Sequence, residues 1–353
     1  MCIAILLAVS LLAAGAARSL RSADARTKPE STRHMKLYLL KRFAKRGGGP
    51  PELLILGSSR AMRAEPSVLR RALKVRAFNA AVGAGAPADA LAFVRYVRLH
   101  YPGQRFSILW LLDIENLRLQ GIHPYLRSVP ELVDCLPAGL DRRGTALGLP
   151  DDGPLGAPPA PVGSAGSRVR ALDAQSRWAA DGFLMWCYYD YWRAQGVAAA
   201  TRLQHQLAHY SGIYPPRSGS GLTGWSKWLV RRVIREANAM GGTPVVVLTP
   251  YHPSLLRFIA GRGWGRVHKE ALGFLRGLRG QFRLRVLDMT SIASFGGWAG
   301  GFYDGVHGRP VMIRRLLREV LRRAGPDLLL PSPTPTPTST PTTSPSPSPS
   351  SAG

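Results

Sequence analysis

The chain is poor in acidic residues, lysines and cysteines. Of its 353 residues 21 are acidic and 47 basic, a formal net charge of +26, and only seven of the basic residues are lysine. So much arginine in a chain rich in Ala, Gly and Pro is typical of a GC-rich genome. No basic stripe interleaved with aromatic residues is present, which argues against nucleic acid as a partner. The charge leaves an anionic membrane or cell-wall surface as a partner to consider.

The sequence also lacks an apolar run long enough for an ordinary membrane-spanning helix. The longest one, at the start, ends in the small-x-small pattern Ala14-Gly15-Ala16, which is typical of a signal peptidase site, although no basic segment precedes it. We therefore expect residues 1–16 to be a signal peptide or signal anchor. The protein would be exported, either secreted or held on the extracellular side. Of three cysteines one lies in this leader, and whether Cys135 pairs with Cys187 stays open.

The other end of the chain has nothing to bury. Residues 331–353 contain only Pro, Ser, Thr, one Ala and one Gly, so we expect a disordered, extended stalk. The organisation predicted for the whole chain has six parts: a leader (1–16), a basic linker with a partial helix (17–51), a first globular part (52–136), a Gly/Pro-rich insertion with an aromatic helical cap (137–220), a second globular part (221–330) and the tail (331–353).

Short apolar runs alternate with helical patterns through both globular parts. The runs predict strands at 53–56, 75–78, 106–112, 244–248 and 284–287, and the helices are expected at 35–45, 66–74, 87–100, 221–240, 264–278 and 310–323. Continuous apolar strands separated by helices are typical of a parallel sheet covered on both faces. The sequence therefore predicts a three-layer α/β/α domain, flavodoxin-like, with a five-stranded parallel sheet and a helical insertion after the third strand.

The insertion itself allows two interpretations. Its aromatic stretch, residues 172–210, either packs as a small helical subdomain or forms a lid whose rings line a substrate groove. His205 and His209 have the i, i+4 spacing of metal ligands, but no third ligand accompanies them. We expect a surface helix face there, with no metal and no cofactor.

In an open parallel sheet, ligands bind beyond the carboxyl ends of the strands, and chemically useful residues gather at those positions here. The five blocks are Gly57-Ser58-Ser59-Arg60, the segment from Asn79 to Gly85, Asp113 to Asn116, Thr249 to Pro253, and Phe302 to His307. Together they supply a serine nucleophile, a histidine base, an orienting carboxylate and glycine-rich backbone.

These blocks resemble the SGNH/GDSL hydrolase superfamily. Gly-x-Ser after the first strand, Asn and Gly after the second, and Asp-x-x-His before the last helix follow its order, in particular that of its DltD-like and polysaccharide-acetylation-associated branch. The resemblance covers roughly residues 52–115 and 243–324. No Gly-x-Ser-x-Gly follows a strand, so the α/β-hydrolase elbow does not apply.

The resemblance implies a role for each matching residue. Ser59 corresponds to the nucleophile, His307 to the base and Asp304 to the acid that orients it. The Ser59 N–H and the Gly83 N–H would form the oxyanion hole, with the register between Gly83 and Gly85 open. The family's Gly-x-Asn-Asp block is missing, and Asn116 is the amide that stands in its place.

Three further residues are candidates for substrate contact: Arg60, Asn79 and His252. Arg60 would either bind an anionic group or pair with a nearby carboxylate. His252 would either face the cleft or make a structural hydrogen bond at the strand end.

The function implied is that of an exported serine esterase or O-acyltransferase. It would act on an ester, such as an acylated envelope carbohydrate, through an acyl-Ser59 intermediate. The sequence does not separate hydrolysis from transfer. The alternative is a catalytically silent SGNH-like domain that binds polysaccharide or scaffolds an assembly.

Overall fold

The computed structural model describes residues 30–46, 48–138, 140, 178–184, 198–215 and 221–330. The expected leader, the expected tail, Cys187 and most of the Gly/Pro-rich insertion lie outside these residues. None of the described helices is both long and apolar enough to cross a membrane.

The centre of the protein is a parallel sheet with the strand order β2-β1-β3-β4-β5. Its strands are β1 (Leu53–Gly57), β2 (Ala77–Asn79), β3 (Ser107–Leu112), β4 (Val245–Leu248) and β5 (Arg285–Asp288). This confirms the predicted α/β class and the flavodoxin-like sheet. Because the chain moves first to one side of β1 and then to the other, the carboxyl ends of β1 and β3 border the point where ligands bind in such sheets.

Successive strand residues point to opposite faces of the sheet and enter two separate cores. On β1, Leu54 and Leu56 belong to one core, whereas Leu53 and Ile55 belong to the other. All four side chains are buried, which explains why the strand reads as a continuous apolar run in the sequence.

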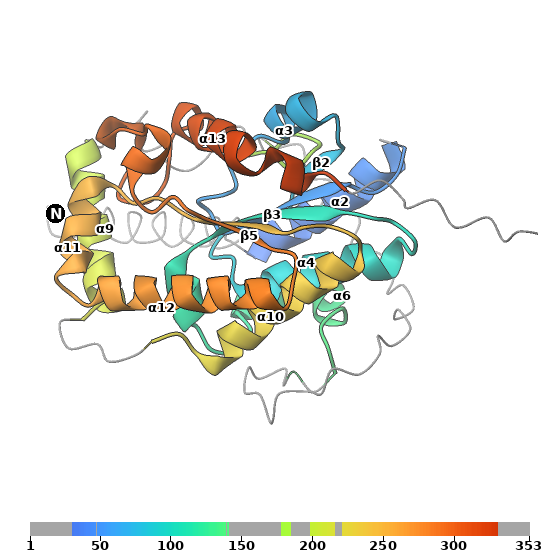
Figure 1. Ribbon diagram of the computed structural model, residues 1–353, viewed down its shortest axis with the longest axis horizontal. Helices are drawn as coiled ribbons and strands as arrows, with labels where there is room; N and C mark the ends of the chain where they lie inside the picture. The colour runs from blue at the N-terminus through green and yellow to red at the C-terminus, as the bar shows by residue number, and fades with distance from the viewer. Residues whose placement is uncertain are drawn as a thin grey trace, which may run out of the picture.

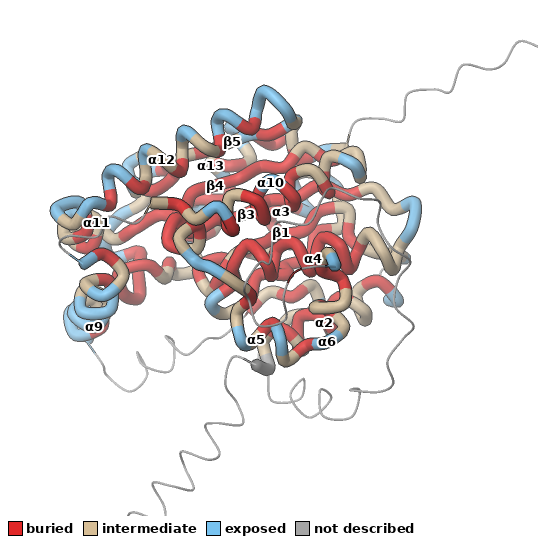
Figure 2. The backbone as a smooth tube through the Cα atoms, turned by 90° about the horizontal axis from the view of Figure 1, so that it is seen from below, coloured by how far each residue is buried: buried red, intermediate tan, exposed pale blue. Residues whose placement is uncertain are grey.

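Helices cover both faces (Figure 1). The smaller core lies under α3 (Pro66–Leu73) and α13 (Pro310–Leu328). The larger core lies under α2 (Glu30–Arg46), α4 (Pro87–His100), α10 (Gly224–Ala239), α11 (Pro253–Ala260) and α12 (Trp264–Gly277). The buried strands and inner helix faces contrast with the exposed outer face of α12 in Figure 2.

Several predicted boundaries are wrong by a few residues. The second strand begins at Ala77 rather than residue 75, and α13 continues to Leu328 through a kink at Ala324, past the expected end at 323. The segment expected to be a basic linker with a helix at 35–45 holds α2, which begins five residues earlier and buries Met35 and Leu40 in the larger core. The compact body therefore begins before residue 52. Its apolar face had been obscured by the surrounding basic residues.

Short helices connect the strands and were not predicted. They are η1 (Ile114–Arg118), α5 (Pro124–Arg127), α6 (Pro130–Val133), α11, η2 (Leu278–Gly280), η3 (Ile292–Phe295) and η4 (Ala299–Gly301). Cys135, just after α6, is a buried free thiol, and burial raises its pKa to about 12.

Two described pieces of the predicted cap touch the main body. Residues 178–184 lie against the end of β2, where the Asn79 N–H donates to the Asp181 carbonyl at 2.8 Å. Helix α9 (Ala199–Ile213) packs beside α11 at the carboxyl edge of the sheet (Figure 1). These contacts place part of the insertion at the strand ends rather than in a detached subdomain.

The last residue of β1 is a glycine because the chain turns sharply there. Gly57 has φ +147°, and a Cβ at this position would lie 2.5 Å from the Leu111 carbonyl oxygen and 2.6 Å from Cβ of Ala61. β1 and β3 can therefore stay paired while the next two residues turn out of the sheet.

Replacing Gly57 by Ala should lower the free energy of unfolding by about 3 kcal/mol, because strain and overlap with backbone add. Gly103→Ala is the matched control. It also has positive φ, +79°, but open space around the missing Cβ, so it should cost only about 1 kcal/mol. Urea denaturation measures both, and equal losses for the two variants would contradict the steric account of Gly57.

Candidate active site

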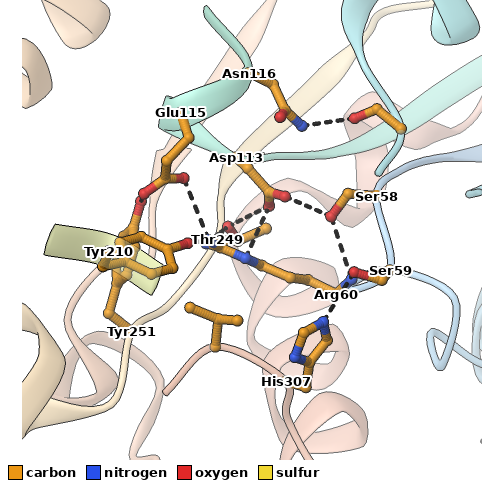
Figure 3. A network of polar contacts seen from close by, with 12 residues as sticks. Ser58, Ser59, Arg60, Asp113, Glu115, Asn116, Tyr210, Thr249, Tyr251 and His307 are labelled. Atoms are coloured by element: carbon orange, nitrogen blue, oxygen red, sulfur yellow. Dashed lines mark hydrogen bonds and ion pairs between the residues drawn. The ribbon is translucent and has the colours of Figure 1, made fainter. Parts of the chain in front are cut away.

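The predicted nucleophile lies at the switch point of the sheet. Ser58 and Ser59 follow β1 in a tight turn, in which the Ala61 N–H donates to the Ser58 carbonyl at 3.0 Å. His307 and Asp304 come from the loop that leads into α13. The structure brings these distant segments together at one edge of the sheet (Figure 3).

Ser59, His307 and Asp304 form a continuous chain of hydrogen bonds. Oγ of Ser59 lies 2.8 Å from Nε2 of His307, and Nδ1 of His307 lies 2.8 Å from Oδ2 of Asp304. The Asp304 side chain is 1% exposed and that of His307 11%. With the Nδ1 proton donated to the buried carboxylate, the lone pair on Nε2 faces the serine hydroxyl, which is the tautomer that a general base requires.

Asp304 is held as a carboxylate. Burial raises the pKa of its carboxyl, but the charge of His307 and the hydrogen bonds of its ring, together with the backbone N–H groups of Val306 and His307, lower the pKa further than burial raises it. Both N–H groups donate to Oδ1 at 2.8 Å. The net shift is downward, so the carboxyl is ionised at neutral pH.

The predicted oxyanion donors differ in whether their N–H groups already have an acceptor. Within the described residues, no acceptor is bonded to the backbone N–H of Ser59 or of Gly83. The Gly85 N–H instead donates to the Val82 carbonyl at 3.1 Å, so Gly83 is the better candidate of the two glycines. One N–H of the Asn116 side-chain amide donates to the Gly85 carbonyl at 2.6 Å, which holds the amide in place, and its role as an oxyanion donor stays a prediction.

The neighbouring serine has a structural role. Ser58 points away from His307 (Figure 3), donates its hydroxyl to Oδ2 of Asp113 and accepts the Arg60 N–H at 3.2 Å. Asp113 also accepts the Thr249 hydroxyl at 2.7 Å. The ends of β1, β3 and β4 are thus tied together directly behind the nucleophile.

The guanidinium of Arg60 fills the middle of this arrangement. It donates to Thr249 at 2.9 Å and to Glu115 at 3.2 Å, and its Nε lies 3.5 Å from Oδ1 of Asp113. The side chain is 6% exposed. Burial lowers the pKa of Arg60, but Asp113, Tyr210 and Glu115 outweigh burial and raise it.

Two tyrosines complete the surroundings of Arg60. The Tyr251 hydroxyl donates to Glu115 at 2.6 Å, and its ring lies 4.8 Å below the guanidinium. Tyr210, from α9, bonds to Arg60 through its hydroxyl. Burial raises the pKa of both phenols, so both stay neutral.

The three predicted substrate contacts each have a structural partner. Arg60 is buried among carboxylates, as the second interpretation had it. Asn79 is fully buried, with its amide donating to the carbonyls of Ala61 and Ala64. His252 caps α11 by accepting the Ser254 N–H at 3.1 Å, which is the structural hydrogen bond considered for it. At Arg60 and Asn79 the polar groups satisfy buried charges or the backbone, whereas the bond of His252 uses only Nδ1 of its ring.

Two residues on α9 that support the loop carrying Asp304 were not predicted. Arg202 donates to the Tyr303 carbonyl at 2.7 Å, and Gln206 donates to Oδ2 of Asp304 at 3.2 Å. They lie four residues apart and thus on one side of the helix. This four-residue spacing was the only feature of the sequence that could have indicated their role.

The other side of α9 holds the histidine pair. His205 and His209 are exposed, and no cluster of three metal-ligating side chains occurs among the described residues. The expectation of a surface helix face is in agreement with these positions.

The buried charges around Arg60 generate a stability prediction. Arg60→Met should lower the free energy of unfolding by about 3–5 kcal/mol, because it leaves two buried carboxylates without their cation. Arg314→Met is the control: it breaks an ion pair with Glu65 in which the arginine side chain is 40% exposed, and should cost at most about 1 kcal/mol. Chemical denaturation with equal losses for both would contradict the role given to Arg60.

Comparison with known proteins adds no identification. No family model matches the chain, and no curated protein matches its sequence. The interpretation of the site therefore depends on its geometry.

Proposed function

We propose that the protein is a serine esterase or O-acyltransferase that forms an acyl-enzyme on Ser59. The single observation that supports this is the uninterrupted hydrogen-bonded chain from Ser59 through His307 to Asp304 at the switch point of the sheet. A buried carboxylate, a correctly oriented imidazole and a half-exposed serine are the parts of nucleophilic acyl transfer.

In the first step, Ser59 attacks the carbonyl carbon of an ester while His307 takes the hydroxyl proton on Nε2. The C–O bond to Ser59 forms and the carbonyl oxygen becomes an oxyanion. The backbone N–H groups of Ser59 and Gly83 are the donors available to it. Asp304 stabilises the imidazolium formed on His307.

In the second step, the tetrahedral intermediate collapses. The bond to the leaving alcohol breaks, and His307 returns its proton to that oxygen. Water or the hydroxyl of an acceptor then attacks the acyl carbon while His307 takes its proton. The bond between the acyl carbon and Oγ of Ser59 breaks, and His307 returns the proton to Ser59. The same residues serve both outcomes, which is why hydrolysis and transfer share one site.

Substrate class and location come from the sequence. The resemblance of the strand-end blocks to the polysaccharide-acetylation branch makes an acylated envelope carbohydrate the proposed substrate, and residues 1–16 make export the proposed location. One N–H of the Asn116 amide is engaged with the Gly85 carbonyl, and its second N–H stays a candidate donor beside the two backbone groups. Loss of one such donor typically lowers turnover by about 10²–10³-fold.

Ser59→Ala should abolish hydrolysis of p-nitrophenyl acetate, and Ser58→Ala is the matched control. Ser58 points to Asp113 rather than to His307, so the Ser58→Ala variant should still react with a fluorophosphonate probe. Peptide mass spectrometry should find the probe attached to Ser59. If wild type and Ser59→Ala release p-nitrophenol at equal rates, the silent binding domain is the correct alternative. If acylated sugar appears when a sugar acceptor is added, the reaction is transfer.

Asp304→Asn tests the acid independently of the nucleophile. An amide cannot hold the imidazole in the required tautomer, so kcat should fall by about 10³–10⁴-fold with little change in fold. Asp327→Asn, in an exposed region of α13, is the control and should keep full activity. A kcat for Asp304→Asn within a few-fold of wild type would remove Asp304 from the mechanism.

A further inference from the structure

A second feature of the molecule lies on the outward side of α13. Val311, Arg315, Arg318 and Arg322 are all exposed, and their spacing of four, three and four residues puts them in one line along the helix. Trp298 lies beside this line, with the Arg315 guanidinium 5.5 Å from the centre of its ring. We call these five residues the Trp298–α13 surface.

This surface exposes apolar groups that proteins usually bury. Among the described residues, four large hydrophobic side chains are exposed, and two of them are here: Trp298 at 40% and Val311 at 49%. Both neighbour Arg315, one through the ring contact and the other one helical turn away. The two exposed hydrophobic side chains therefore belong to the same patch.

The loop that carries Trp298 is fastened to the helix. Arg315 donates to the Gly296 carbonyl, and Arg323 donates to the Ser294 carbonyl at 2.6 Å. The Gly301 N–H closes a turn on the Trp298 carbonyl at 2.9 Å. The indole is thus presented to the outside by a held loop.

The charge of the surface is positive. Glu319 is the one acidic residue on α13 between Val311 and Arg323, and both Arg322 and Arg323 bond to it. Arg318 has no ion-pair partner within the part of the chain that the structure describes. An exposed tryptophan beside uncompensated arginines combines an apolar group with an attraction for anions.

We propose that the Trp298–α13 surface docks on an anionic lipid membrane. Tryptophan favours the interface between headgroups and hydrocarbon, and arginines near the surface are attracted to anionic headgroups. A soluble polyanion could pair with the arginines but would offer no apolar phase to the indole and Val311. A bilayer satisfies both, which is why the lipid surface is the occupant that fits.

Docking would also orient the candidate active site. Val311 lies in the first turn of α13, four residues after His307, so one end of the surface is next in the chain to the loop that carries His307. The proposal does not depend on the esterase activity and can fail separately from it.

Co-sedimentation of the full chain with vesicles tests the proposal. The probes are phosphatidylcholine vesicles with and without an equal part of phosphatidylglycerol. Wild type should bind the anionic vesicles and lose binding in high salt. Trp298→Ala and Arg318→Glu should each weaken binding about tenfold.

Two controls match these changes on other surfaces. Leu119→Ala removes a hydrophobic side chain with the same exposed fraction, 40%. Arg276→Glu makes the same charge change on α12, which covers the opposite face of the sheet (Figure 1). Both should bind as wild type does, and circular dichroism checks that all four variants fold.

Three results would overturn the proposal. One is equal weakening by Arg318→Glu and Arg276→Glu, which would mean general electrostatic attraction. Another is unchanged binding by Trp298→Ala. The third is binding to soluble polyglutamate as tight as to vesicles and insensitive to Trp298, which would assign the surface to a polyanion.

Discussion

The arrangement of the site depends on one buried cation. Arg60 follows the candidate nucleophile in the chain, and its guanidinium bonds to groups at the ends of β3 and β4 and to Tyr210 on α9. Two carboxylates and one arginine cannot be buried together unless each finds its partner, so the strand ends have little freedom to shift. The same contacts fix the turn that presents Ser59. Stability and geometry at this edge of the sheet thus have a common origin.

Much of the fold could be predicted because it is encoded locally. Each strand is buried on both faces, so its apolar run is visible in the sequence, and the triad residues stand at fixed positions after strands or before a helix. The partners of Arg60 were not predictable in the same way: Asp113, Thr249 and Tyr210 are 53, 189 and 150 residues away from it. The hydrogen bonds of Asn79 and Asn116 to backbone carbonyls were also not predicted. In the sequence, an asparagine that bonds to carbonyls cannot be distinguished from one that binds a ligand.

Helix α2 is a second case in which tertiary contacts decide a role. Arg33 forms a buried bidentate pair with Asp89, at 2.6 and 2.9 Å, and also donates to the Gly83 carbonyl at 3.2 Å. Lys36 donates to the Asn79 carbonyl at 2.7 Å, and burial lowers its pKa although Asp181 opposes the shift. A segment that looks like a basic linker therefore holds both ends of the loop that supplies a candidate oxyanion donor.

The side-chain amides near the site are occupied with backbone, and this shapes the chemistry available. Asn79 holds the turn after Ser59, and Asn116 holds the carbonyl of Gly85. Backbone N–H groups are then candidate donors to an oxyanion, and their direction is set by the turns that Arg33, Asn79 and Arg60 stabilise. Such donors need no rearrangement when charge develops, because the fold has already oriented them. Under the proposed function, the buried charges around the site would act on the reaction through the orientation of these peptide groups.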